Sequence, residues 1–145
     1  MRCGRANWVR SALLIMMALA VLVGPRPVHA QADGDYIFDI LKRRPAMLKS
    51  WRWIVPQKYA GQAWIKSLEG TSGPVDRVIV GGKPFVLGSA CWPHNCGGNF
   101  VAFLIAADGS EAYGMLRSSD LRAQDEAFGS PDETKRRMLT EVLSR

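Results

Sequence analysis

The chain has 145 residues, and its 19 Lys and Arg against 13 Asp and Glu give a formal net charge of +6. Four of the basic residues are arginines within residues 1–30, a segment with no acidic residue, so residues 31–145 carry a net charge of only +2. Nucleic-acid binding, which needs a clustered basic surface, is therefore not favoured. Residues 31–145 are long enough for one domain with one modest core.

Residues 1–30 have the organisation of a secretory signal peptide. A basic start precedes an apolar stretch at residues 11–23, which is short for a membrane span. The segment Val28-His29-Ala30 places small residues where a signal peptidase reads them. We therefore expect cleavage after Ala30 and export of residues 31–145. After cleavage, the exported chain is not expected to be attached to a membrane. The alternative is an uncleaved anchor, which the cleavage pattern disfavours.

Two helices are predicted at the start of the exported chain. Apolar residues recur at helical spacing in residues 35–43, which indicates a short amphipathic helix. A second apolar helical face follows Pro45, a residue that is tolerated at the first position of a helix. The tryptophans of this region are interpreted as core anchors rather than as platforms for sugars: Trp51, Trp53 and Trp64.

The pattern changes to strands after residue 74. Gly81-Gly82 and Asp108-Gly109 are hairpin-turn signals between stretches of high strand propensity. Residues 100–106 are apolar on both alternating faces, which is typical of a central strand covered on both sides. We expect an antiparallel meander of four strands at residues 75–80, 85–90, 100–106 and 111–117.

The C-terminal part is predicted to end in a helix. Residues 118–129 are polar and are expected to be irregular. A helix is expected to follow, with Ser130 as its cap, Pro131 at its first position and Glu133 completing a capping box. The expected fold class is α+β, a single domain with helices outside a central antiparallel sheet.

One short motif, at residues 91–96, concentrates the reactive side chains. After removal of residues 1–30, Cys91 and Cys96 are the only cysteines of the chain and His94 is its only histidine. An exported protein meets oxidising surroundings, which favours a disulfide between the two cysteines. Closing so short a loop stabilises a fold by only about 2 kcal/mol, so its main effect is to shape the loop.

The motif lacks what the common chemical uses of cysteine and histidine require. Structural zinc needs four ligands, whereas Cys91, His94 and Cys96 supply three. A thioredoxin-like redox pair needs two intervening residues, and here there are four. A nucleophilic cysteine activated by histidine needs a free thiol. Two roles that need neither a reaction nor a metal ion remain. The motif is either a structural clip or a rigid turn that presents His94 to a partner.

The motif also resembles a known family. The pattern Ser89-Ala90-Cys91-x-Pro93-His94-x-Cys96-Gly97 is similar to the signature of the Ivy family, periplasmic inhibitors of vertebrate c-type lysozyme. The similarity extends from residues 62–65 to residues 114–116. It implies a central antiparallel sheet with short helices packed on one side and a protruding, disulfide-closed loop. It implies that His94 is the inserted residue of a lysozyme-binding loop formed by Cys91, Trp92, Pro93, His94, Asn95 and Cys96.

The resemblance implies a protein that is not an enzyme. Such a protein would lie in the periplasm, would need no cofactor or metal, and would occlude the cleft of c-type lysozyme or a related muramidase. The family's loop commonly has a basic residue at the place of Trp92 and an acidic one at the place of Asn95, so the target stays open. Other hypotheses are a regulator of the bacterium's own peptidoglycan-cleaving enzymes, a cell-wall binding module, and an enzyme using a cysteine with His94. The sequence leaves the oligomeric state open, a homodimer included.

Overall fold

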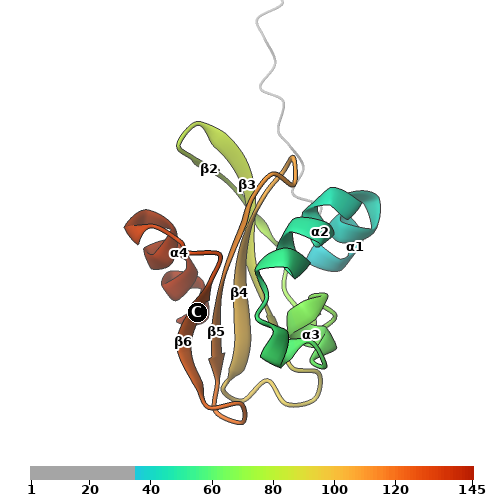
Figure 1. Cartoon of the computed structure of the whole chain (residues 1–145), viewed down its shortest axis with the longest axis vertical. Coiled ribbons are helices and arrows are strands. Elements are labelled where there is room, and N and C mark those ends of the chain that lie inside the picture. The colour runs from blue at the N-terminus through green and yellow to red at the C-terminus, as the bar shows by residue number, and fades with distance from the viewer. Residues whose placement is uncertain (1–34) are drawn as a thin grey trace, which may run out of the picture. The chain divides into compact units, whose positions relative to one another are not determined.

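The fold is built around an antiparallel sheet of six strands (Figure 1). The computed structural model describes residues 35–145, so the expected signal peptide and its cleavage site lie outside the described residues. The helices are α1 (Ile37–Arg43), α2 (Pro45–Ile54), the short 3-10 helix η1 (Gln57–Tyr59), α3 (Ala63–Lys66) and α4 (Glu133–Leu143). The strands are β1 (Thr71–Ser72), β2 (Asp76–Val80), β3 (Lys83–Cys91), β4 (Asn99–Ala106), β5 (Ala112–Ser118) and β6 (Ala123–Phe128).

The strand order is β1-β3-β4-β5-β6, and β2 also pairs with β3. The long strand β3 pairs with β2 along its first half and with β1 at its end, where Cys91 lies opposite Thr71. The expected meander, which corresponds to β2, β3, β4 and β5, is confirmed, and so is the α+β class. All pairings between these strands are antiparallel.

The prediction of an irregular segment at residues 118–129 is wrong, because strand β6 lies within it. Only Ala123 and Phe128, the two ends of β6, are buried, so the strand lacks the apolar pattern of the other strands. Pairing with β5 and a hydrogen bond from the Tyr59 hydroxyl to Glu126 (2.7 Å) hold it at the sheet edge. A polar edge strand of this kind has the composition of a loop.

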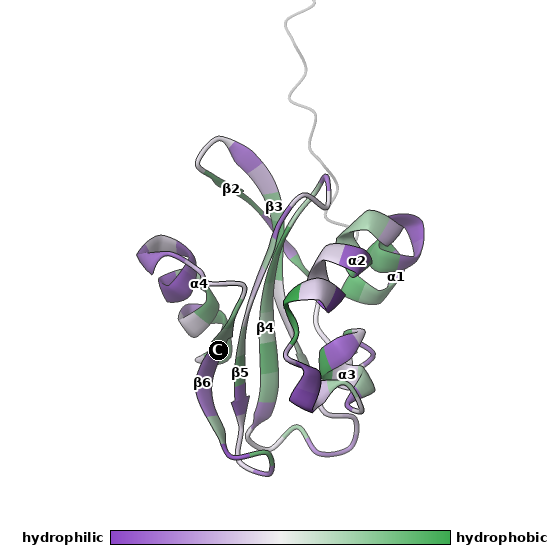
Figure 2. Cartoon of the chain, in the orientation of Figure 1, coloured by the Kyte–Doolittle hydropathy of each residue, from purple (hydrophilic) through white to green (hydrophobic). Residues whose placement is uncertain are grey.

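Helices cover both faces of the sheet, and not one face as the resemblance implied. In Figure 1, α1, α2 and α3 lie on one side of the sheet and α4 lies on the other. The side chains of β4 alternate between two buried clusters, with Val101, Phe103 and Ile105 facing α1–α3 and Ala102 and Leu104 facing α4. This agrees with the expected central strand, and Figure 2 shows hydrophobic residues along β4 and mostly hydrophilic residues in α4.

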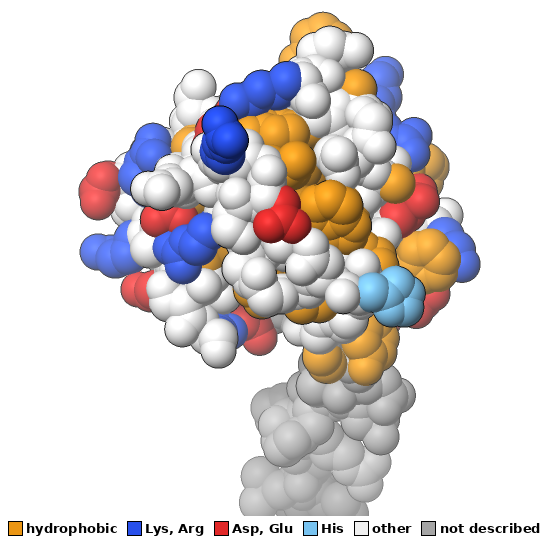
Figure 3. All heavy atoms as spheres, turned by 90° about the horizontal axis from the view of Figure 1, so that it is seen from below, with side chains coloured by type: hydrophobic (Ala, Val, Ile, Leu, Met, Phe, Trp, Pro, Cys, Tyr) orange, Lys and Arg blue, Asp and Glu red, His pale blue; other side chains and the backbone are white. Residues whose placement is uncertain are grey.

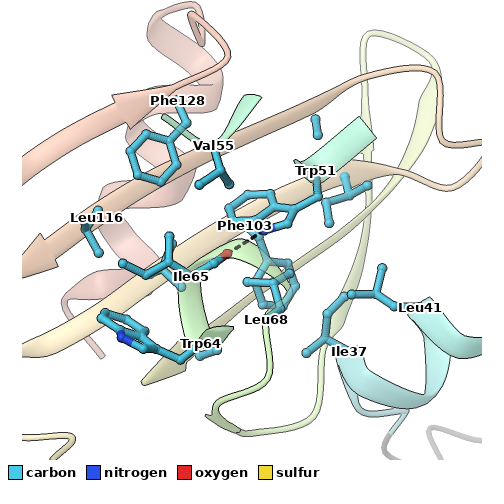
Figure 4. Packing of buried hydrophobic residues seen from close by; sticks show 14 of the residues in the cluster. Ile37, Leu41, Trp51, Val55, Trp64, Ile65, Leu68, Phe103, Leu116 and Phe128 are labelled. Carbon is cyan, nitrogen blue, oxygen red and sulfur yellow. Dashed lines mark hydrogen bonds between the residues drawn. The ribbon is translucent and has the colours of Figure 1, made fainter. Parts of the chain in front are cut away.

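Trp51 lies at the centre of the larger cluster (Figure 4). Its indole N–H donates to the Ile65 carbonyl at 2.8 Å, and its ring contacts Phe103 edge-on, with 6.4 Å between the ring centroids. The prediction of core tryptophans is confirmed for Trp51 and Trp64 but is wrong for Trp53, which is 90% exposed. Two positions along a helix correspond to about 200°, so Trp53 points away from the face that buries Trp51.

The last helix begins two residues later than predicted. Asp132, and not Ser130, is the N-cap, and its carboxylate accepts from the Lys135 backbone N–H at 2.9 Å. Ser130 lies before the helix with a φ of 54°, so it takes no part in a capping box. Within residues 35–145, no helix has the length and apolar composition to cross a membrane.

Candidate functional site: the cysteine loop between β3 and β4

The six residues 91–96, here called the cysteine loop, connect the end of β3 to the start of β4. Cys91 and Cys96 are joined by a disulfide with their Cα atoms 5.1 Å apart, which confirms the predicted pairing. Gly98 follows with a φ of 83°, a left-handed conformation that glycine adopts without strain, and the chain turns back into β4. The loop therefore lies at one end of a rigid sheet, at the bottom of Figure 1.

His94 lies at the apex of a tight turn. The Asn95 backbone N–H donates to the Trp92 carbonyl at 3.0 Å, which closes a four-residue turn around Pro93 and His94. His94 has a φ of 63°, and proline at the second position with a left-handed third residue is the pattern of a type II turn. Histidine is one of the few residues enriched in the left-handed region. The side chain of His94 is exposed, and Figure 3 shows it in pale blue at the rim of the face seen from below.

Trp92 fixes one side of the cysteine loop to the helical layer. Its ring stacks on Trp64 of α3, with 5.9 Å between the ring centroids and 17° between the planes. Trp64 is 3% exposed, and Trp92 is half-buried against the larger core cluster. Part of the aromatic surface of Trp92 is thus used inside the protein, where it anchors the loop.

Asn99 holds the C-terminal half of the cysteine loop through hydrogen bonds from the protein interior. This side chain is fully buried at the start of β4, and its amide N–H donates to the Asn95 carbonyl at 3.1 Å. Its amide oxygen accepts from the Ser118 hydroxyl at 2.6 Å. Within residues 35–145, no buried side-chain nitrogen or oxygen atom lacks a hydrogen-bond partner. The loop conformation is therefore held by a satisfied buried polar network as well as by the disulfide.

A second loop, residues 119–122 between β5 and β6, lies against the cysteine loop. The Asn95 side-chain amide donates to the Asp120 carboxylate at 2.6 Å, and the Ser119 backbone N–H donates to the Gly98 carbonyl at 3.0 Å. Sequence reasoning missed Asn99, Ser118 and Asp120, which are polar residues at strand ends and look like ordinary turn residues. The one available signal was the position of Asn99 and Ser118 as polar residues at the ends of two mostly apolar strands.

The disulfide limits the chemistry of the site. Because Cys91 and Cys96 are bonded to each other, neither supplies a thiolate to a substrate or a metal ion. Within residues 35–145, no three residues among His, Cys, Asp and Glu form a group that could hold a metal ion. The fold and the site thus define a small α+β domain with a disulfide-closed, exposed turn that carries His94.

The comparison with known proteins identifies the family of this small α+β domain. The sequence profile of the family described as "Inhibitor of vertebrate lysozyme (Ivy)" matches residues 46–143, and this chain belongs to that family. The match confirms the resemblance drawn from the cysteine motif. It also confirms that the protein is not an enzyme, since the members of this family are inhibitors.

Three relatives share about a quarter of their residues with this chain. A Pseudomonas aeruginosa protein named "Inhibitor of vertebrate lysozyme" is 28% identical, over 92% of this chain and 93% of that protein. An uncharacterised Yersinia pestis protein is 27% identical, over 72% of this chain and 75% of its own length. Another Pseudomonas aeruginosa protein, also uncharacterised, is 26% identical over 92% of this chain and 90% of its own length.

Proposed function

We propose that this protein is a periplasmic inhibitor of c-type lysozyme that blocks the active-site cleft with the cysteine loop. The observation that carries the proposal is the exposed His94 at the apex of a turn that is fixed on every side. Membership of the Ivy family and the name of the Pseudomonas relative support lysozyme as the partner. The proposed compartment follows from residues 1–30, and isolation of a mature chain that begins at Gln31 would test it.

The chemistry of the target suits an inserted imidazole. Glycosidases of the lysozyme kind carry two carboxyl groups about 5–5.5 Å apart, one of which has a raised pKa. An imidazole offers two ring nitrogens, and the imidazolium donates hydrogen bonds from both. His94 inserted between the two carboxyl groups would hydrogen-bond to them and exclude the sugar. Inhibition would then be by occlusion, without a reaction of the inhibitor.

The rigidity of the loop favours tight binding. Ordering a flexible side chain at an interface costs about 0.5–1.5 kcal/mol, and ordering a backbone segment costs more. The turn around Pro93, the disulfide and the Trp92–Trp64 stack order the cysteine loop before the partner arrives. More of the contact energy with lysozyme therefore appears as affinity.

Substitution of His94 tests the proposal in a lysis assay with c-type lysozyme. Alanine at this position would also strain the left-handed turn by about 1–2 kcal/mol, so His94→Asn and His94→Gly, which tolerate this conformation, are the better variants. We expect both to weaken inhibition by about a hundredfold, the loss of two hydrogen bonds to charged groups at about 1.5 kcal/mol each.

Undiminished inhibition by His94→Asn would refute the insertion of His94. A wild-type protein that fails to inhibit c-type lysozyme but inhibits the bacterium's own peptidoglycan-cleaving enzymes would favour the regulatory function instead. Thermal unfolding of each variant provides the control, because an intact domain is required for either comparison.

A further inference from the structure

The cysteine loop and the 119–122 loop form one continuous surface. They are joined by the Asn95–Asp120 and Ser119–Gly98 hydrogen bonds, and beneath them by the buried Asn99. A hollow of about 960 Å³ lies beside the 119–122 loop and is lined by Ser119 and Arg122 of that loop and by Gly98, which follows the cysteine loop. A partner that closes over His94 therefore also meets the 119–122 loop.

Asp120 contributes a negative charge to this surface, which also carries the exposed Arg122. The Asp120 side chain is exposed, and none of the ion pairs found within residues 35–145 includes it. Its hydrogen-bond partners are neutral: the amides of Asn95 and Asn99 and the hydroxyl of Ser119. These contacts orient the carboxylate without neutralising it, so its charge stays available to a partner. Figure 3 shows acidic side chains on the same face as the histidine.

The neutral side chain of Asn95 is suited to its position beside the Asp120 carboxylate. Its amide donates to Asp120 at 2.6 Å, whereas a carboxylate at position 95 would lie against a second carboxylate and repel it. The cysteine loop thus uses a neutral residue to position a charge that comes from another loop, 25 residues along the chain.

We propose that Asp120 is a specificity-determining contact that pairs with a Lys or Arg side chain beside the cleft of the bound lysozyme. The inference rests on the proposed function, because it takes the partner to be the enzyme that receives His94. Asp120 would select partners with a basic rim around the cleft and would speed their association. A muramidase with an acidic rim would be disfavoured by the same charge.

The test measures the affinity for c-type lysozyme of Asp120→Asn at low and at high salt. Asparagine keeps the shape and an oxygen acceptor for Asn95 but removes the charge. Asp39→Asn is the matched control, because Asp39 is an exposed acid on α1 that belongs to no ion pair found within residues 35–145. We expect Asp120→Asn to bind about fivefold more weakly at low salt, the difference shrinking as salt screens the pair, and Asp39→Asn to bind like the wild type.

Four results would overturn the inference. Equal losses for Asp120→Asn and Asp39→Asn would mean that only net charge matters. A loss that is unchanged by salt would show that Asp120 merely shapes the loop. No loss for Asp120→Asn, while His94→Asn still weakens binding, would leave the proposed function standing without this contact. A wild-type protein that does not bind lysozyme would overturn both proposals together.

Discussion

Asn99 is the residue on which the position of the cysteine loop depends most directly. Its side chain is fully buried and links the Asn95 carbonyl of the loop to the Ser118 hydroxyl of β5. A buried polar group that loses its partner costs about 1–3 kcal/mol. In the proposed mechanism, Asn99 would therefore contribute both to stability and to inhibition.

We expect Asn99→Ala to lower the free energy of unfolding by about 1–3 kcal/mol and to weaken lysozyme inhibition, because the loop loses its support. Denaturant unfolding and the lysis assay measure the two effects. Gln57→Ala is the control, since Gln57 is an exposed amide in η1 and lies outside both loops of the site. Wild-type inhibition by a folded Asn99→Ala variant would show that the buried network does not position the loop.

Whether a site residue could be predicted from the sequence depends on how far along the chain its interaction partners lie. The disulfide and the exposed His94 were predictable, because cysteine, proline and histidine have strong local preferences and lie within six residues. Asn99, Ser118 and Asp120 were not, because their shared network depends on hydrogen bonds between residues 19 to 25 positions apart in the sequence. Single polar residues carry no record of such partners in the sequence.

At the scale of the elements, the cysteine loop has three attachments besides its hydrogen bond to Asp120. These are the Cys91–Cys96 disulfide, the stacking of Trp92 on Trp64, and the hydrogen bonds of Asn99. The disulfide closes only a short loop, which stabilises the fold by about 2 kcal/mol. The two other attachments do not depend on it.

Reduction of the disulfide is therefore expected to weaken inhibition while the domain stays folded. Loss of the covalent closure lets the turn around His94 fluctuate, and the entropy of ordering it again is then lost on binding. Circular dichroism and the lysis assay, with and without reductant, separate the two properties. Loss of secondary structure on reduction would contradict the view that the disulfide acts mainly on its own loop.

The elements also show which parts of the fold could be predicted. Strands β2 to β5 have β-branched or doubly apolar patterns between clear turns, so their order followed from the sequence. Strand β6 did not, because its edge position leaves most of its residues polar and its pairing with β5 alone defines it. The placement of α4 on the opposite face depends on how the whole sheet is covered, which no local pattern contains.

At the scale of the whole molecule, carboxylates link stability to pH. Arg43 hydrogen-bonds to Asp35 and lowers its pKa, and Lys83 does the same to the pKa of Glu111. A carboxyl whose pKa is lower in the folded than in the unfolded state makes the unfolded state bind more protons in acid. The resulting stabilisation is complete above the unfolded pKa and is lost as the pH falls through the folded pKa.

We therefore expect the thermal midpoint to be nearly constant between pH 6 and 7 and to fall below about pH 4.5, where the unfolded carboxyls begin to take up protons. Thermal unfolding followed at a series of pH values measures this. A midpoint that rises on acidification would contradict the assigned ion pairs.

The central claim is that the cysteine loop occupies the cleft of c-type lysozyme, and competition for that cleft tests it most directly. The affinity of this protein for lysozyme is measured by calorimetry with and without a chito-oligosaccharide that fills the cleft. We predict that the oligosaccharide weakens binding in proportion to its own occupancy of the cleft. An unchanged affinity at saturating oligosaccharide would show that the loop binds elsewhere and would contradict the proposed mechanism.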